Sequence, residues 1–441
     1  MRGWTTVLAA GLAGTLAAGA LLAAQGGRGG VQVKPGEPCP PGTTLVRPGR
    51  CSAPEFPPPS IVDYRPRTTL VVAEHRVPSA KFPVIDSHNH TTVNAANIDQ
   101  LIREMDELNL RVLVNLSGGS NPDSVKQKVE FIRASRHPDR FRVFANVAWN
   151  GAGGPGWAEK AVADLEQSIR NGAIGLKIAK DLGMFAKKAD GSRLHVDDPA
   201  LKPIWDLCAR LNVPVIIHTA EPQEFFSPLD YQNERWLELA LFRDRRHFAP
   251  GEPTFRELVG ERDRMYAANR KTRFIGAHFD WYGNDLRRAA EQLDRLPNLV
   301  LEVGAVLYEF GRQPRAAREF FIKYQDRILF GKDSYQASEF PYYWRVFETA
   351  DEYFDYYRDY HAFWKLYGMD LPDAVLKKLY YQNERWLELA LFRDRRHFAP
   401  GEPTFRELVG ERDRMYAANP KTRFIGAHFD WYGNDLRRAA E

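Results

Sequence analysis

The chain has 441 residues, of which 44% are hydrophobic and 27% are charged. Its 61 lysines and arginines nearly balance 57 aspartates and glutamates, and the net charge of +4 is not gathered in any block. Such a chain is long enough to bury a large core, and its balanced charge argues against nucleic acid or a membrane surface as a partner.

The first 24 residues predict a signal peptide. Arg2 is followed by an apolar, Ala/Leu/Gly-rich stretch from Thr5 to Ala24, and Ala18-Gly19-Ala20 or Ala23-Ala24 offers a small-residue cleavage site. The alternative is an uncleaved anchor helix, for which a stretch of roughly 20 residues so rich in Gly and Ala is less suited. We therefore expect an exported, periplasmic or secreted protein with no stable membrane association after cleavage.

Residues 25–80 are rich in Pro and Gly and predict a linker. They contain Cys39 and Cys51, which in an oxidising compartment could close a small loop as a disulfide. The alternative is two unpaired linker cysteines. Cys208, in an amphipathic run, is expected to be a small buried hydrophobic residue.

Between Pro83 and Ser334, eight short β-branched or apolar runs alternate with helical patterns. The runs are Val84 to His88, Arg111 to Leu116, Arg142 to Val147, Ala173 to Ile178, Pro214 to His218, Arg273 to His278, Asn298 to Val303 and Arg327 to Gly331. Among the helical patterns are Asn97 to Leu108, Asp123 to Ser135, Trp157 to Arg170, Pro199 to Leu211, Asn284 to Leu296 and Pro314 to Tyr324. This alternation predicts an α/β fold, a (β/α)8 TIM barrel over residues 81–380. An open doubly wound sheet is the alternative, but it calls for a Gly-rich turn after the first strand, where Ser87-His88-Asn89-His90 stands.

Ionisable side chains end four of these strands. In Asp86-Ser87-His88-Asn89-His90, alternate side chains of an extended chain point the same way, so both imidazoles face one side. The fifth, sixth and eighth runs lead into His218, His278 and Asp333. Four histidines and an aspartate in these places are hard to explain by packing, and they predict a metal site at the carboxyl ends of the strands.

The motifs Asp-Ser-His-Asn-His and Leu-Phe-Gly-Lys-Asp-Ser resemble those of the amidohydrolase superfamily. The resemblance is to the amidohydrolase-related branch, which includes aminocarboxymuconate semialdehyde decarboxylase, resorcylate decarboxylase and several lactone hydrolases. It implies that His88, His90, His218 and Asp333 bind one divalent metal and that His278 is the catalytic histidine of the sixth strand. Lys332 stands where the family often has Ser or Thr, and should point away from the metal if Asp333 points toward it.

Three functions follow from this ligand set. Histidines and one carboxylate suit Zn²⁺, with Mn²⁺ as the competitor, and such an ion acidifies bound water and polarises a carbonyl, leaving His278 and Asp333 to move protons. We predict hydrolysis of an ester, lactone or amide of a small organic acid. The alternative is non-oxidative decarboxylation of an unsaturated or aromatic carboxylate. A barrel that binds without turnover is a third reading, against which the complete ligand set argues. A homodimer is one possible assembly.

Four further polar residues in or beside strands have two readings each. Asp86 either orients a ligand imidazole or is a buried core carboxylate. For Lys177 we favour contact with a substrate carboxylate or a structural ion pair over a metal-bridging carboxylated lysine. Glu302 and Asn115 either line the pocket or are satisfied interior groups. The insertion of about 50 residues between the fifth and sixth runs predicts a lid.

Residues Tyr381 to Glu441 repeat Tyr231 to Glu291 with one difference, Arg270 against Pro420. Near-identity at a single place indicates recent copying and not a solenoid. We interpret residues 381–441 as the product of recombination or sequence misassembly at a short stretch of sequence that both segments share. We expect this segment to have no function of its own. We expect a weakly packed appendage that exposes apolar residues such as Trp386, Leu387 and Leu391.

Overall fold

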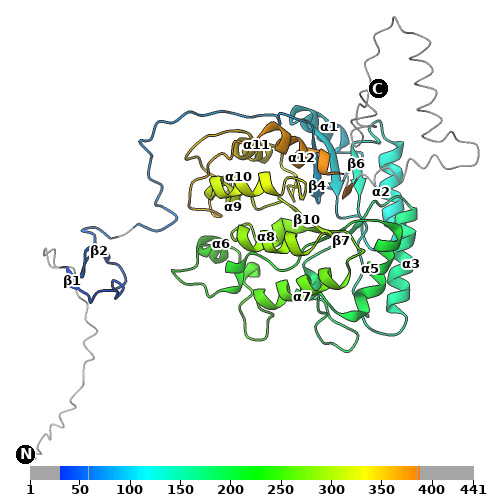
Figure 1. Cartoon of the computed structure of the whole chain (residues 1–441), viewed down its shortest axis with the longest axis horizontal. Coiled ribbons are helices and arrows are strands. Elements are labelled where there is room, and N and C mark those ends of the chain that lie inside the picture. The colour runs from blue at the N-terminus through cyan, green and yellow to red at the C-terminus, as the bar shows by residue number, and fades with distance from the viewer. Residues whose placement is uncertain (1–29, 58, 385, 388–441) are drawn as a thin grey trace, which may run out of the picture. The chain divides into compact units, whose positions relative to one another are not determined.

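The computed structural model describes residues 30–57, 59–384, 386 and 387 (Figure 1). The predicted signal peptide, residues 1–24, and most of the second copy, residues 388–441, lie outside this range. The chain divides into two compact units between Thr69 and Leu70. No helix in the described part combines the length and the apolar character that crossing a membrane requires.

The first unit contains a small antiparallel sheet where the sequence predicts a linker. Its strands are β1 Val31–Gln32, β2 Thr44–Arg47 and β3 Arg50–Ser52, in the order β1-β3-β2. A disulfide joins Cys39 to Cys51, and Cys51 is buried. Strands of two to four residues are too short to show a hydrophobic alternation, which is why the sequence pattern missed this sheet.

The second unit holds eight parallel strands among its described residues. They are β4 Val84–Asn89, β5 Leu110–Asn115, β6 Phe141–Val143, β7 Leu176–Ile178, β8 Val215–Ile217, β9 Phe274–Gly276, β10 Leu299–Glu302 and β11 Ile328–Leu329. Strands β4 to β6 form one sheet in chain order, and β7 to β11 form another. The bridge between Ala145 and Leu176 joins β6 to β7, and that between Asn89 and Asp333 joins β4 to the end of β11. The strands thus succeed one another around a ring, and the predicted (β/α)8 TIM barrel is confirmed.

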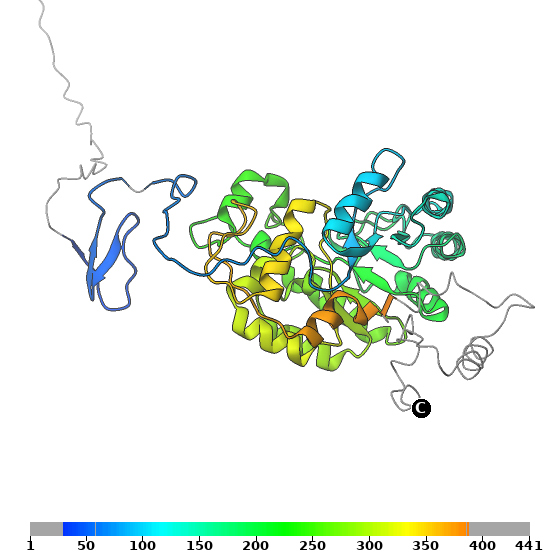
Figure 2. The same ribbon diagram turned by 90° about the horizontal axis from the view of Figure 1, so that it is seen from above.

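Helices follow the strands and cover the outside of the barrel (Figure 2). They are α1 Ile98–Glu107, α2 Pro122–Ala134, α3 Trp157–Arg170, α4 Asp181–Met184, α5 Lys202–Leu211, α6 Trp236–Leu241, α7 Phe255–Ala268, α8 Leu286–Arg295, α9 Leu307–Arg312, α10 Pro314–Lys323, α11 Phe340–Glu348 and α12 Asp373–Tyr380. Helices α2, α3 and α5 stand side by side (Figure 1). Local signals set the boundaries: Asn121 caps α2 just before Pro122, and Thr254 with Glu257 forms a capping box on α7.

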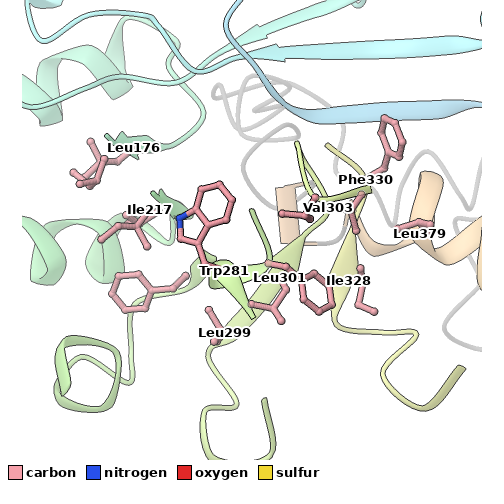
Figure 3. Close-up of a cluster of buried hydrophobic side chains, with 14 of the residues drawn as sticks. Leu176, Ile217, Trp281, Leu299, Leu301, Val303, Ile328, Phe330 and Leu379 are labelled. Carbon is pink, nitrogen blue, oxygen red and sulfur yellow. The ribbon is translucent and has the colours of Figure 1, made fainter. Parts of the chain in front are cut away.

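The hydrophobic core has two layers. The outer layer packs the strands against the helices, and it includes Trp281 beside strand residues such as Ile217 and Leu301 (Figure 3). The aromatic residues of α11, among them Tyr343 and Trp344, are buried in this layer as packing residues. The inner layer fills the barrel; its members are Val114, Leu116, Phe144, Ile174, Ile216, Ile275, Ala277, Val300, Leu329 and Leu387.

The expectation that the second copy exposes Trp386 and Leu387 is wrong. Leu387 is fully buried in the inner layer of the barrel, and Trp386 is partly buried against it. The side chain of Asn383 donates to the carbonyl oxygens of Gln325 and Ile328, at 2.7 and 2.8 Å. The first residues of the copy therefore complete the barrel, because they bring an apolar side chain and hydrogen-bond donors to strand β11.

Candidate metal centre and active site

The five predicted site residues lie together at the carboxyl ends of the strands. His88 lies on β4 and His90 directly follows its last residue, and the bridge between Asn89 and Asp333 sets Asp333 beside them. The backbone N–H of Asp333 donates to the carbonyl of His88 at 2.6 Å, and that of His90 donates to the carbonyl of Asp333 at 3.1 Å. Closure of the barrel therefore brings residues of its first and last strands into one cluster.

Three side-chain atoms of this cluster have the spacing of metal ligands. His88 Nε2 lies 3.2 Å from Asp333 Oδ1 and 3.3 Å from His90 Nε2, and His90 Nε2 lies 3.6 Å from Asp333 Oδ1. Ligand atoms at 2.0–2.1 Å from a tetrahedral Zn²⁺ are about 3.3 Å apart. These residues therefore fit a divalent metal in number, chemistry and spacing.

His278 and His218 extend the cluster. Potential ligand atoms of His88, His278 and Asp333 all lie within 4.8 Å of one another. His278 Nδ1 is 2.8 Å from the carbonyl oxygen of Gly304, so it carries the proton, and the free Nε2 lies 3.2 Å from His218 Nδ1. His218 thus reaches the group through His278, whereas His88, His90 and Asp333 form direct short contacts.

The protonation states of His90, His278 and Asp333 suit metal binding. Burial, and next the charge of His88, lower the pKa of His90 to about 3; burial and His218 lower the pKa of His278 to about 3. Burial alone would raise the pKa of Asp333, but the hydrogen bond to His88 and the charges of the imidazoles hold it well below its ordinary value. Neutral imidazoles and an ionised carboxylate are the forms that bind a divalent ion. Burial and the charge of Lys177 act to lower the pKa of His88, but the carboxylates of Glu302 and Asp333 more than offset them and raise it, so His88 must give up a proton when an ion binds.

Glu302, at the end of β10, holds the cluster in place from below. Its Oε1 lies 2.8 Å from His88 Nδ1 and accepts from the backbone N–H of His278 at 2.5 Å, while Oε2 accepts from the N–H of Gly304 at 2.6 Å. Burial opposes its charge, but the charge of His88 and these hydrogen bonds lower its pKa to about 2. A proton fixed on His88 Nδ1 leaves Nε2 as the ligand atom. The sequence marked Glu302 only as a polar residue in an apolar run.

Of the two roles predicted for Asp86, that of a buried core carboxylate fits the structure. Its carboxylate accepts from the backbone N–H groups of His88 and Lys332 and from the side chain of Asn89, and no contact with an imidazole ring is found in the described structure. Burial raises its pKa to about 7. Asp86 is therefore a buried core carboxylate that ties β4 to the segment that follows β11. Lys332 Nζ points to Ser334 and Glu339, away from the cluster.

Lys177, on β7, points into the cluster. Its Nζ lies 3.1 Å from His88 Nε2 and is buried, and burial lowers its pKa to about 8 although Asp333 and Glu302 oppose this. The cation therefore faces the atoms that a substrate would approach. Asn115, in contrast, uses its side-chain oxygen to cap the N–H of Ser117 and is a satisfied interior group.

A second group of potential ligands lies elsewhere, at His195, Asp197 and Glu261. Glu261 there already binds Arg193 at 2.5 Å and His195 at 2.7 Å, and these hydrogen bonds outweigh burial and lower its pKa. Because a guanidinium already neutralises the carboxylate, we interpret this group as a structural ion-pair cluster.

A family model described as Amidohydrolase matches residues 85–385, so the chain belongs to the amidohydrolase family. Among solved structures, the chain is similar to an uncharacterized TIM-barrel protein from Bordetella bronchiseptica, with 15% identity, a TM-score of 0.45 and coverage of 70% of this chain and 99% of that one. It is also similar to 2,6-dihydroxybenzoate decarboxylase in complex with 2,6-dihydroxybenzoate, with 14% identity, a TM-score of 0.41 and coverage of 70% of this chain and 99% of that one. A 4-oxalomesaconate hydratase from Rhodopseudomonas palustris has 12% identity, a TM-score of 0.43 and coverage of 70% of this chain and 97% of that one. None of the curated proteins compared with the chain matches it.

Proposed function

We propose that this member of the amidohydrolase family is a metal-dependent hydrolase that acts on an ester, lactone or amide of a small organic acid. The observation that carries the proposal is the ligand-like spacing of His88, His90 and Asp333 beside His278. His218 is proposed as the remaining ligand. Zn²⁺ is the ion that this set suits best, with Mn²⁺ as the competitor.

The residues of the cluster divide the chemistry between them. A divalent ion bound there supplies Lewis-acid polarisation of a carbonyl and acidifies water. Asp333, ionised at neutral pH, and His278, whose Nε2 is unprotonated, are the groups that accept and return a proton. Glu302 holds His88 and the backbone of His278 in the required orientation. Lys177 can pair with a carboxylate of the substrate.

Lys177 is also the observation that favours decarboxylation as the second candidate. A buried ammonium whose pKa is about 8 can hold a substrate carboxylate beside the ligands, or deliver a proton to carbon as carbon dioxide leaves. The same residues serve both proposed reactions, which differ in the bond that breaks. Hydrolysis breaks the acyl C–O or C–N bond, and decarboxylation breaks the C–C bond to the carboxylate.

The test is a product assay with the metal-loaded protein on a panel of small esters, lactones and amides together with unsaturated and aromatic acids. Hydrolysis creates a new carboxylate, which a pH-stat records, whereas decarboxylation releases carbon dioxide. An Asp333→Ala variant should lose either activity. Absence of turnover on the whole panel by metal-loaded protein would contradict both proposals and leave a binding-only barrel.

We also propose that the protein is exported. The apolar stretch from Thr5 to Ala24 supports this, and a disulfide between Cys39 and Cys51 is typical of an oxidising compartment. Cell fractionation with an antibody against the barrel tests the proposal, and recovery in the cytosol with the amino-terminal segment intact would contradict it.

A further inference from the structure

His278, the group proposed to move a proton, begins a turn with an unusual backbone. From His278 to Trp281, four consecutive residues have φ angles of 56°, 57°, 51° and 59°. Residues other than glycine rarely adopt this left-handed conformation, because Cβ comes too close to the following carbonyl oxygen. They persist in it only where the surrounding structure enforces it, most often at functional sites. Some contact must therefore hold this turn in place.

The side chain of Asp280, the third residue of the turn, provides this contact. Asp280 is 1% exposed, and its carboxylate accepts from the hydroxyl of Tyr266 at 3.2 Å and from the side chain of Gln292 at 3.0 Å. The fully buried guanidinium of Arg262 donates to the backbone carbonyl of Asp280 at 2.9 Å and lies 3.5 Å from its carboxylate. These partners belong to α7 and α8, so the carboxylate attaches the turn to two helices.

Gly276, the last residue of β9, leaves room for the carboxylate of Asp280. A Cβ at this position would lie 2.5 Å from Cγ and from Oδ1 of Asp280. The φ angle of Gly276 is −75°, which any residue can adopt, so the close approach of Asp280 is the reason for glycine here. The end of the strand and the turn are thus fitted to one carboxylate.

The left-handed turn sets the direction of the His278 ring. The Nδ1 of this ring lies 2.8 Å from the carbonyl oxygen of Gly304, and the backbone N–H of His278 donates to Glu302 at 2.5 Å. The ring also stacks on the indole of Trp281, with centroids 4.7 Å apart and 19° between the planes. A relaxed turn would carry Trp281 away and free the ring to rotate, so that its Nε2 would no longer be held 3.2 Å from His218 Nδ1.

We propose that Asp280 is a positioning residue that acts on the reaction through His278. It holds the turn, and the turn keeps the ring of His278 with its Nδ1 proton on Gly304 and its Nε2 facing the proposed metal ligands. This inference rests on the proposed function, in which His278 moves a proton, and goes beyond it by assigning the group that orients this histidine. A catalytic group held in its productive geometry speeds the chemical step. Loss of the Asp280 carboxylate should therefore lower kcat and leave KM and the zinc content unchanged.

Two variants disturb the same carboxylate in different ways. Asp280→Asn keeps the shape of the side chain and removes its charge, whereas Gly276→Ala keeps Asp280 and pushes a methyl group against it. In both variants kcat should fall about 10- to 100-fold, because a shift of about 1 Å at a catalytic group has an effect of this order. KM and zinc content should stay at the values of the parent. Turnover is measured on the zinc-loaded full chain with the substrate that the product assay identifies.

Glu261→Gln is the matched control. Glu261 is likewise a buried carboxylate, 3% exposed, and it pairs with Arg193 at 2.5 Å, but it lies outside the candidate active site. Its loss should lower the unfolding temperature and leave kcat unchanged. If Glu261→Gln lowers kcat as strongly as Asp280→Asn, the effect is a general loss of stability and the proposal is overturned.

The proton position on His278 gives a reading that a purely structural role of Asp280 would not change. NMR of the zinc-loaded full chain labelled with ¹⁵N in its histidines distinguishes a proton on Nδ1 from one on Nε2, and the spectrum of His278→Ala assigns the signals. The parent should show the proton on Nδ1 alone, and both variants should show a mixture of the two forms. Ring signals identical to those of the parent in both variants overturn the proposal. If Asp280→Asn does not fold, Gly276→Ala and Tyr266→Phe, which removes one hydrogen bond of the carboxylate, decide by the same signals.

A failure of the proposed function is recognised separately. A parent that binds no zinc or turns over no substrate contradicts that function, while the ring signals still decide whether Asp280 orients His278.

Discussion

At the scale of single residues, the site is built from side chains whose proton positions are set by their neighbours. Glu302 holds the proton on His88 Nδ1, and the carbonyl of Gly304 holds that on His278 Nδ1. In both imidazoles Nε2 then points toward another member of the cluster. The orientation of each histidine ring therefore depends on a hydrogen-bond partner that takes no direct part in the proposed reaction.

Removal of one proposed ligand should release the metal. We expect His88→Ala and Asp333→Ala to lose most of the bound ion, because each removes one of three donors whose ligand atoms lie 3.2 to 3.6 Å from one another. Elemental analysis after gel filtration measures this. His195→Ala, in the ion-pair cluster, should keep the full content. One equivalent retained in both site variants would place the metal elsewhere.

His278→Ala should abolish turnover and keep the metal. The three direct contacts among His88, His90 and Asp333 persist without it, and a further protein ligand would close the position that the reaction needs. Turnover and metal content of the same sample decide. Loss of metal together with activity would make His278 a ligand.

Glu302→Gln should weaken metal affinity without emptying the cluster. A partner of this kind typically contributes about 10- to 100-fold in affinity, because it orients the imidazole and raises its basicity. Competition with a coloured chelator gives the dissociation constant. An affinity equal to that of the parent would show that the contact between Glu302 and His88 is only structural.

At the scale of elements, the strands were easier to predict than their ends. Apolar runs that are buried on both faces identify all eight strands. Six of the eight predicted runs extend past the end of the observed strand; those through His218 and His278, for example, overrun β8 and β9, which end at Ile217 and Gly276. No local signal announces a left-handed turn without glycine, because a buried network formed by distant residues imposes it. Glu302, in contrast, was open to prediction as a charge in an apolar strand that needed a partner.

Helix α9 carries a titratable group that should make stability depend on pH. Burial, opposed by Arg312 and reinforced by Glu224, raises the pKa of Glu309 from 4.5 to about 7. The folded state thus binds this proton more tightly than the unfolded chain, and the resulting stability is complete below pH 4.5 and lost as the pH rises through 7. Glu309→Gln should reduce the fall of the unfolding temperature over this range, whereas Glu319→Gln on the exposed face of α10 should leave it unchanged. An identical decline in Glu309→Gln and the parent would contradict the prediction.

At the scale of the whole molecule, the two copies of the repeat show that identical sequences can have different contacts and different burial. The side chain of Asn233 donates to the carbonyl of Glu224, while its copy Asn383 donates to Gln325 and Ile328. Leu237 is partly buried, but its copy Leu387 lies fully buried in the barrel. The burial of a residue depends on its surroundings in the fold. The surroundings of the second copy are set by the residues before it, which bring its first residues to one end of the barrel.

This difference predicts where the chain can be shortened. Truncation after Tyr380 removes Asn383 and Leu387, and loss of one buried leucine alone costs about 2–5 kcal/mol. Truncation after Leu387 keeps every contact that the structure describes for the copy. We expect the shorter chain to unfold at a clearly lower temperature than the longer one in calorimetry. Equal unfolding temperatures would show that residues 381–387 add nothing.

The bridge between Asn89 and Asp333 has a consequence for folding. His88 and Asp333 meet only when the last strand has docked on the first, so a chain caught before this step has half of its donors on an open edge. An ion that binds only the closed barrel adds RT ln(1 + [L]/Kd) to the free energy of unfolding of the barrel. Ion binding therefore favours the pairing of the first strand with the last. Chains in which β11 has not yet docked should therefore be the species most exposed to proteolysis, and adding metal should raise the fraction that resists it.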